Sequence, residues 1–186
     1  MNNPTRRALL RAAGGLIAAA VVPGRGGSAW AATVVEIHMR SDRAGGVVGF
    51  DPVGMLVAPG TTVRWVCDAN VHTSAAYAPR NMNHSQRIPL AARPWASDFL
   101  LPGQHFEVTL MVEGVYDYYC MPHEQAGMVG RLIVGRPSGP GTLPFDYFRD
   151  KGEHWLPVPA AAQKTFPRIA DILASRVIRS SLDFSR

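Results

Sequence analysis

A ten-residue segment, Tyr119 to Met128, constrains the fold of this chain more than any other feature of its sequence. It places the thiol of Cys120, the imidazole of His123 and the thioether of Met128 within nine residues. A soft thiolate, an imidazole and a weak thioether suit copper better than any hard cation, and a blue-copper site takes two His and one Cys in a plane with a long axial Met. The segment supplies three of these four ligands. One more His is needed, and His72 is the candidate.

Strand-forming residues flank this segment on both sides. Residues 115–120 are rich in Val and Tyr, and residues 129–134 are largely aliphatic, which is typical of β-strands. Between them, residues 121–122 (Met-Pro) and 126–127 (Ala-Gly) are turn-forming pairs. The pattern predicts a short loop clamped between two strands, with Cys120 at a strand end. Such a loop holds its donors in nearly one geometry for both charges of the metal, which lowers the reorganisation that accompanies electron transfer.

Short strands punctuated by Gly and Pro recur upstream of this segment. Residues 33–39 alternate apolar and polar side chains, residues 47–50 and 54–57 are short apolar runs, and residues 61–67 form another strand. Many short strands of this kind predict an all-β sandwich with one core. The chain has no internal repeat and no glycine-rich phosphate loop.

Several short motifs accompany the candidate ligands. They are Phe50-Asp51-Pro52, Pro59-Gly60-Thr61-Thr62-Val63, Gly114-Val115-Tyr116, Tyr119-Cys120, Pro122-His123 and Ala126-Gly127-Met128-Val129-Gly130. On these motifs, residues 46–135 resemble the small blue copper proteins, the cupredoxins, and most of all plastocyanin and its prokaryotic relatives halocyanin and pseudoazurin. The resemblance implies a cupredoxin-like Greek-key β-sandwich with one type 1 copper ion. It implies that His72, Cys120 and His123 are the equatorial ligands and that Met128 is the axial ligand.

His72 follows the strand of residues 61–67 and is the only His near its end. In the family that this chain resembles, the first copper His lies just after that strand, and an Asn usually follows it. Here Thr73 stands in the Asn position. Its peptide N–H is still available, so a hydrogen bond from Thr73 to the sulfur of Cys120 is expected. The side-chain hydrogen bonding around the metal should differ from the family pattern.

Residues 1–31 have the pattern of an export signal. Arg6 and Arg7 lie in a Thr-Arg-Arg-Ala-Leu-Leu sequence that resembles a twin-arginine signal. An uncharged run follows over residues 12–22, and residues 29–31 (Ala-Trp-Ala) suit cleavage. A Sec signal with a chance Arg pair is the alternative. Because the uncharged run is too short to span a bilayer as a helix, we expect a mature protein in the periplasm or outside the cell, with no transmembrane span.

The basic charge of the chain is concentrated in that leader. Four of the 19 Lys and Arg residues lie in residues 1–31, which contain no Asp or Glu, so the remaining 15 basic and 14 acidic residues nearly cancel. A nucleic-acid-binding function therefore loses its support. The two cysteines do not indicate a disulfide, because Cys120 is needed as a thiolate. Cys67 is then expected to be a buried free thiol.

The composition changes after the predicted last strand. Residues 137–186 begin with a Pro- and Gly-rich linker, continue with a stretch rich in Pro and aromatic residues, and carry an apolar stripe at helical spacing over residues 166–182. The chain thus divides into a signal peptide (1–31), a cupredoxin domain (32–136) and a C-terminal extension with a short helix (137–186). The helix is expected to pack on the sandwich or on a second copy, with partner docking as the alternative. The extension is predicted to be dispensable for copper ligation.

These features predict a one-electron carrier and not an enzyme. Redox proteins such as a c-type cytochrome, an oxidase, a reductase or a dehydrogenase are the expected partners. A copper storage or delivery module is an alternative that the Met and His of residues 81–84 slightly favour. A copper enzyme would need further His-x-His or Cys-His ligand groups, which the chain lacks. A zinc site would suit thiolate and imidazole but not the thioether of Met128.

The resemblance also indicates where electrons enter or leave. His123 should present its ring edge at the surface, within an apolar patch formed by Met121, Pro122 and either Val47 or Val48. Because the charges outside the leader nearly cancel, long-range electrostatic steering of partners should be weak.

Overall fold

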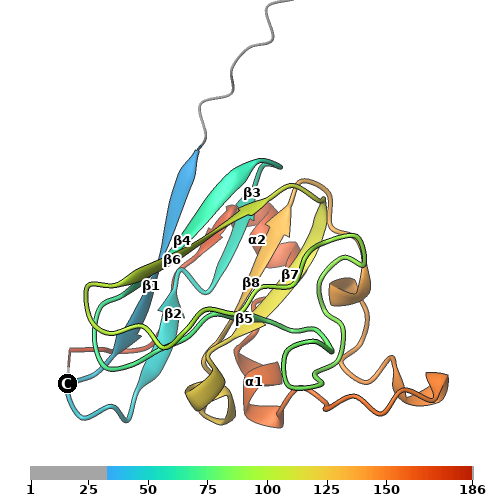
Figure 1. The fold of residues 1–186 in the computed structure, drawn as a ribbon. Coiled ribbons are helices and arrows are strands. Elements are labelled where there is room, and N and C mark those ends of the chain that lie inside the picture. Colours follow the sequence, from blue (N-terminus) through green and yellow to red (C-terminus); the bar gives the residue numbers. More distant parts are fainter. Residues whose placement is uncertain (1–32, 186) are drawn as a thin grey trace, which may run out of the picture. The chain divides into compact units, whose positions relative to one another are not determined.

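Two β-sheets face each other in residues 33–185, the part of the chain that the computed structural model describes (Figure 1). The predicted signal peptide at residues 1–31 lies outside the described residues. One sheet has the order β2-β1-β4-β6, formed by Val48–Asp51, Val34–Ser41, Thr61–Cys67 and His105–Leu110. The other has the order β5-β7-β8-β3-β9, formed by Ala75–Ala76, Gly114–Tyr119, Val129–Val134, Gly54–Val57 and Val177–Ile178.

Alternating side chains build the core between the two sheets. In β4, Val63, Trp65 and Cys67 are fully buried while the residues between them are partly exposed, because successive side chains of a strand point to opposite faces. Strand β1 runs parallel to β4 and antiparallel to β2. The rings of Trp65 and Tyr118 meet edge-on at 5.4 Å and join the two sheets. The predicted all-β sandwich and the buried free thiol of Cys67 are both confirmed.

The C-terminal extension covers the outer face of the second sheet (Figure 1). Every residue of β7 and β8 is buried, so both faces of these two strands are covered. Val158, Ala162 and Phe166 of the extension form one apolar cluster with Tyr119 and Val129 of the sheet. Of the arrangements expected from the sequence, packing of the extension on the sandwich is the one observed.

The extension contains two short α-helices, which confirms the predicted short helix, although the apolar stripe over residues 166–182 is helical only in part. Helix α1 is Ala160–Thr165 and helix α2 is Ile169–Ser175. Pro167 separates them because its ring blocks a continuous helix and disfavours helical backbone at the preceding residue. Arg176, with a φ of 64°, then turns the chain into β9. None of the helices among the described residues is long and apolar enough to cross a membrane. The described 3-10 helices are η1 at Met121–Ala126, η2 at Pro140–Thr142 and η3 at Arg149–Lys151.

A buried group of charges, here called the ionic cluster (Arg87, Asp117 and Arg131), fastens the extension to the sheet. The carboxylate oxygens of Asp117 accept hydrogen bonds from Nε of Arg87 and from Nε of Arg131, each at 2.7 Å. Arg87 also donates to the carbonyl of Gly141 at 2.9 Å, and Arg131 donates to the carbonyl of Pro167 at 2.9 Å. The charges are therefore paired and hydrogen-bonded within the protein, as burial demands.

The last residues of the chain run along the first sheet. Leu182 and Phe184 lie against Gly49 on the edge strand β2, where a Cβ would stand only 2.9 Å and 3.2 Å from them. The N–H of Ser180 donates to Asp51 at 3.1 Å. The C-terminal segment therefore contacts both sheets, because β9 pairs with β3 of the second sheet.

Candidate metal centre

The segment between β7 and β8 folds back as a 3-10 helix, η1. Cys120 has extended backbone at the end of β7, and Pro122 lies in the first turn of η1, where the missing N–H costs no helical hydrogen bond. Gly127 ends the turn with a φ of 84°, a conformation that Gly adopts without strain. The N–H of Met128 donates to the carbonyl of His123 at 3.1 Å, and the N–H of Cys120 donates to the carbonyl of Met128 at 3.0 Å. The predicted short loop clamped between two strands is confirmed.

Three donor atoms converge at this end of the sandwich, and their residues are called the donor cluster (His72, Cys120 and His123). Nδ1 of His72 lies 3.1 Å from Nδ1 of His123, and Sγ of Cys120 lies 3.6 Å and 3.4 Å from these two nitrogens. A point at the centre of this triangle is about 2 Å from each corner, the length of a metal–nitrogen bond. Within residues 33–185, no other group of three His, Cys, Asp or Glu donors could hold one ion. The donor set therefore fits a copper ion.

His72 is held from two sides. Its backbone exchanges hydrogen bonds with Leu100, N–H to carbonyl at 3.1 Å and 2.8 Å, which fixes the position of its Cα. Its Nε2 lies 2.9 Å from the hydroxyl oxygen of Ser41 on β1. When Nε2–H donates to that hydroxyl, the lone pair is on Nδ1, which faces Cys120 and His123. Ser41 can therefore accept a hydrogen bond from the tautomer that a metal needs.

Thr73 supports the thiolate, as the sequence predicts. Its backbone N–H donates to Sγ of Cys120 at 3.3 Å. Its hydroxyl oxygen accepts a hydrogen bond from the N–H of Met121 at 2.7 Å, a contact that an Asn side chain would make differently. The expected hydrogen bond to Cys120 is thus confirmed, and the Thr side chain also fastens the start of η1.

Burial sets the protonation of the donor cluster in the metal-free protein. Burial raises the pKa of the Cys120 thiol to about 11, against the opposing effect of the Thr73 hydrogen bonds. Burial, followed by repulsion from His123, lowers the pKa of His72 to about 4. Burial also lowers the pKa of His123. At neutral pH both imidazoles are therefore neutral and ready to bind a metal, whereas the thiol must lose one proton.

Met128 follows Gly127 at the entrance to β8. Its side chain is fully buried in the same core cluster as Cys120. The thioether therefore faces the protein interior and not solvent, within the same group of buried side chains as Cys120.

Polar residues that the sequence did not single out support η1 from behind. The carboxylate of Glu124, next to His123, is buried and accepts a hydrogen bond from the hydroxyl of Tyr77 at 2.6 Å. Burial raises the pKa of Glu124, although the Tyr77 hydrogen bond acts in the opposite direction. A Cβ at Gly127 would stand 2.8 Å from the hydroxyl of Thr165 on α1, so the extension also backs the loop. In the sequence, only the position of Glu124 next to His123 could have indicated that Glu124 supports the site. No feature of the sequence near Ser41 could have indicated its contact with His72.

The Asn, Met and His of residues 81–84 do not form a second metal site. The side-chain amide of Asn81 donates to the carbonyls of Ala76 and Trp95, each at 2.8 Å. His84 is buried with its Nε2 3.4 Å from Glu124, and Met82 is exposed. The three side chains therefore have separate surroundings, which removes the observation that favoured copper storage.

Comparison with known proteins agrees with the geometry of the donor cluster. The profile of the copper binding proteins of the plastocyanin/azurin family matches residues 36–135. Plastocyanin of Prochlorothrix hollandica is 30% identical over 106 residues, which cover 55% of this chain and 74% of that protein. Chloroplastic plastocyanin of Chlamydomonas reinhardtii is 32% identical over 90 residues, 48% of this chain and 60% of that protein. The match thus spans less than two thirds of this second relative.

Solved pseudoazurin structures have the same fold. A Sinorhizobium pseudoazurin superposes with a TM-score of 0.50 at 29% identity, covering 72% of this chain and 93% of that one. Pseudoazurin from Methylobacterium extorquens superposes with a TM-score of 0.53 at 22% identity, covering 76% and 98%. The similarity to plastocyanin and pseudoazurin that the sequence motifs indicated is therefore confirmed.

Proposed function

Because the chain belongs to the plastocyanin/azurin family of copper-binding proteins, we propose that it carries one electron at a time between protein partners through a type 1 copper site. The observation that carries this proposal is the convergence of two imidazole nitrogens and one thiol sulfur within 3.1–3.6 Å of one another. A bound copper ion supplies the chemistry by alternating between two charge states that differ by one electron.

Each ligand has a distinct role in this proposal. Cys120 would hold the ion through its thiolate and serve as the main electronic conduit, and Nδ1 of His72 and Nδ1 of His123 would bind beside it. Met128 would add a weak thioether donor that tunes the reduction potential. Its burial in the same core cluster as Cys120 supports this assignment.

The surroundings of the ligands favour electron transfer because they resist movement. Ser41 holds His72, Thr73 holds Cys120, and Glu124 anchors η1 to Tyr77. A ligand set that is held from outside keeps one geometry in both oxidation states, and hydrogen-bonded neighbours of this kind orient metal ligands. The protein thus keeps the ligands in place, and a bound metal would accept and release the electron.

Electrons should pass through the surface around His123, which is only partly buried. Met121 beside it is 37% exposed and Pro122 is exposed. Of the two residues expected to complete this surface, Val47 is partly exposed, whereas Val48 is buried at 5% exposure. Phe99 is a further candidate: it is 59% exposed, and the pairing of His72 with Leu100 places it near Thr73, which binds the N–H of Met121.

The site of action follows from the leader. We propose that residues 1–31 direct export, with the mature protein in the periplasm or outside the cell. The partners are then extracytoplasmic redox proteins such as a c-type cytochrome, an oxidase, a reductase or a dehydrogenase.

Substitution of Met121 by Lys tests both the carrier function and the use of the surface around His123 for electron transfer. We expect Met121→Lys to slow electron exchange with a soluble c-type cytochrome about tenfold, because a charged group must be desolvated at the contact. Colour and potential should stay near their parental values. Leu173→Lys on α2, at 42% exposure, is the matched control and should exchange at the parental rate.

Two results would contradict the proposal in different ways. Equal rates for parent and Met121→Lys would mean that electrons do not pass through this face. A copper-loaded protein that cannot be reduced and reoxidised by any one-electron partner would reject the carrier function itself.

A further inference from the structure

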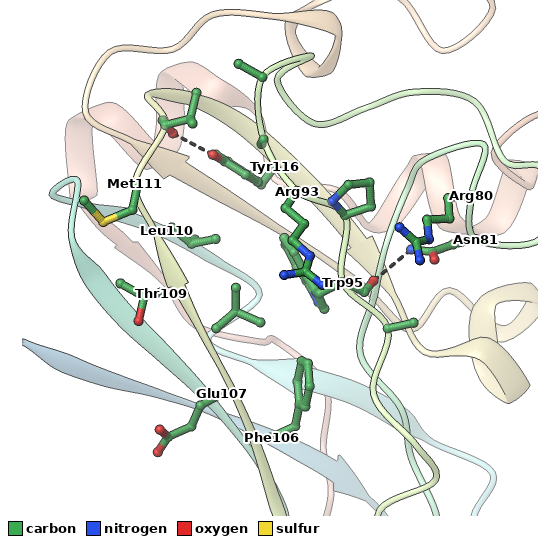
Figure 2. Close-up of a pocket in the computed structure, with 16 residues that line it drawn as sticks. Arg80, Asn81, Arg93, Trp95, Phe106, Glu107, Thr109, Leu110, Met111 and Tyr116 are labelled. Carbon is green, nitrogen blue, oxygen red and sulfur yellow. Dashed lines mark hydrogen bonds between the residues drawn. The ribbon is translucent and has the colours of Figure 1, made fainter.

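A groove lies on the side of the sandwich, alongside β6 (Figure 2). Its volume is about 690 Å³, and one wall is β6 from Phe106 to Leu110. The opposite wall is the loop of residues 91–96. Figure 2 shows Trp95 between these walls, with Arg93 and Arg80 on the loop side. The groove has no residue in common with the donor cluster.

The wall formed by β6 is an unpaired sheet edge. Strand β6 is last in the order β2-β1-β4-β6 and pairs only with β4 within the described residues. Half of the backbone N–H and C=O groups of an edge strand point away from its single neighbour. An extended peptide can satisfy these groups by adding a strand, which is a common mode of peptide recognition.

The rim of the groove carries uncompensated positive charge. Arg80 and Arg93 are exposed, and neither forms an ion pair within residues 33–185. Glu107 also lines the groove, but its carboxylate accepts a hydrogen bond from Nε of Arg64 at 2.6 Å. Arg64 also pairs with Glu36 at 3.1 Å. Arg64 is thus shared between two carboxylates, and Arg80, Arg93 and Arg64 together with Glu107 and Glu36 carry a net charge of +1. The two arginines without ion-pair partners are left to attract carboxylates.

We propose that this groove docks an extended acidic segment of a protein redox partner, which adds as a strand to β6 and pairs its carboxylates with Arg80 and Arg93. The nature of the partner rests on the proposed electron-carrier function. The docking surface itself rests on the free strand edge, the groove and the charge.

Hydrogen bonds connect the floor of the groove with the thiolate. The indole N–H of Trp95 donates to the hydroxyl oxygen of Ser74 at 3.0 Å. The residue before Ser74 is Thr73, whose N–H donates to Sγ of Cys120 at 3.3 Å. A partner in the groove would therefore meet a short, continuous path to copper that avoids the His123 face. Two partners could then exchange electrons through two different surfaces.

A peptide titration tests the docking surface without a natural partner. The probe is a synthetic peptide of about six residues in which Val and Glu alternate, matched to the length of β6. Added to the Cu(I) protein, it should shift the amide resonances of residues 106–110 and the indole N–H of Trp95 in a saturable way. Arg80→Gln/Arg93→Gln should weaken binding about tenfold, as expected for two exposed ion pairs. Arg136→Gln/Arg149→Gln removes the same charge from exposed positions outside the groove and should bind like the parent.

The same peptide with a ruthenium polypyridyl photo-oxidant at one end tests the path. Excited Ru(II) gives one electron to an added cobalt(III) ammine acceptor and becomes Ru(III). Ru(III) then takes one electron from Cu(I), giving Ru(II) and Cu(II), and the rate should saturate with peptide concentration. Trp95→Phe, which removes the indole N–H, should slow the saturated rate several-fold while the blue absorption stays unchanged. An unchanged saturated rate would overturn the path through Trp95.

The outcomes separate this proposal from the proposed function. Shifts confined to η1, equal binding of a Val/Gln or Val/Lys peptide, or self-association of the protein through β6 would overturn the acidic-segment proposal and leave the carrier function intact. A copper-loaded protein that no one-electron partner can reduce and reoxidise, with peptide binding retained, would reject the carrier function and leave the docking surface intact.

Discussion

The donor cluster and the ionic cluster are two buried polar groups in one sandwich, and they are satisfied in opposite ways. In the ionic cluster, two guanidinium groups share one carboxylate and their spare N–H groups reach backbone carbonyls. In the donor cluster, two neutral imidazoles and a thiol turn toward one another with no opposite charge among them. The first group is complete without a ligand, whereas the second becomes complete only with a cation.

This difference teaches how to distinguish a structural polar cluster from a binding site. Paired charges of opposite sign stabilise a packed fold, and removal of one partner leaves a buried charge. Several lone pairs that face one another indicate a metal site. The ionic cluster should therefore control the stability of the copper-free protein, and the donor cluster should control copper binding.

The largest effect is expected from removal of the extension that completes the ionic cluster. A chain that ends after Gly135 loses the carbonyl groups of Gly141 and Pro167 and exposes the outer face of β7 and β8. We expect it to lack a cooperative unfolding transition by circular dichroism. A chain that ends after Ser180 keeps both helices and β9, and should unfold cooperatively.

The sequence predicted that the extension is dispensable for copper ligation, and this truncation decides between the two expectations. A cooperative, blue protein that ends after Gly135 would show that the extension is an accessory layer. The sandwich would then be able to fold although the ionic cluster lacks its backbone partners in the extension.

Next in size is the loss of charge at the centre of the ionic cluster. Asp117→Asn leaves two buried guanidinium groups without an anion and should lower the free energy of unfolding by about 3–5 kcal/mol. Urea denaturation of the copper-free protein measures this change. Asp171→Asn, which breaks the exposed pair with Arg168, should cost less than about 1 kcal/mol. Similar costs for the two variants would show that burial does not distinguish the two ion pairs.

Acid should weaken the copper-free protein through the donor cluster. The folded state holds His72 unprotonated down to a pKa of about 4, whereas an unfolded His takes up a proton near pH 6.5. Between these values the unfolded state binds more protons, so stability is full above pH 6.5 and falls as the pH drops toward 4, by about 3 kcal/mol. Urea denaturation across this range measures the loss.

Two variants identify the source of that pH dependence. His72→Asn should flatten the profile between pH 6.5 and 4.5. His105→Gln, at an exposed position on β6, should leave the profile unchanged. An equally steep profile in His72→Asn would assign the effect to another group, such as His84, whose pKa burial also lowers.

The smallest effect on stability, and the largest on colour, is expected at the thiol. Cys120→Ser keeps the shape of the buried side chain and the hydrogen bond from Thr73, so the copper-free protein should unfold within about 1 kcal/mol of the parent. The intense blue absorption of the Cu(II) form, which arises from thiolate-to-metal charge transfer, should disappear. Retained blue colour would mean that another sulfur is the ligand.

The sequence by itself determined the part of the site that is local. Cys120, His123 and Met128 lie within one loop, and their donor chemistry and spacing identify copper without any knowledge of the fold. The sandwich was predictable because side-chain alternation in strands such as β4 is also a short-range property. The position of His72 was predictable only by resemblance.

Tertiary structure alone decided what surrounds that loop. Ser41 lies 31 residues from His72, Arg87 lies 30 residues from Asp117, and α1 reaches Gly127 from the extension. No periodicity or spacing connects such residues, because their contacts form only when the sheets and the extension pack together. The extension shows both influences: the apolar stripe predicted a short helix, but α2 ends at Ser175 because the chain turns at Arg176 to pair β9 with β3, and α1 was not predicted from the sequence.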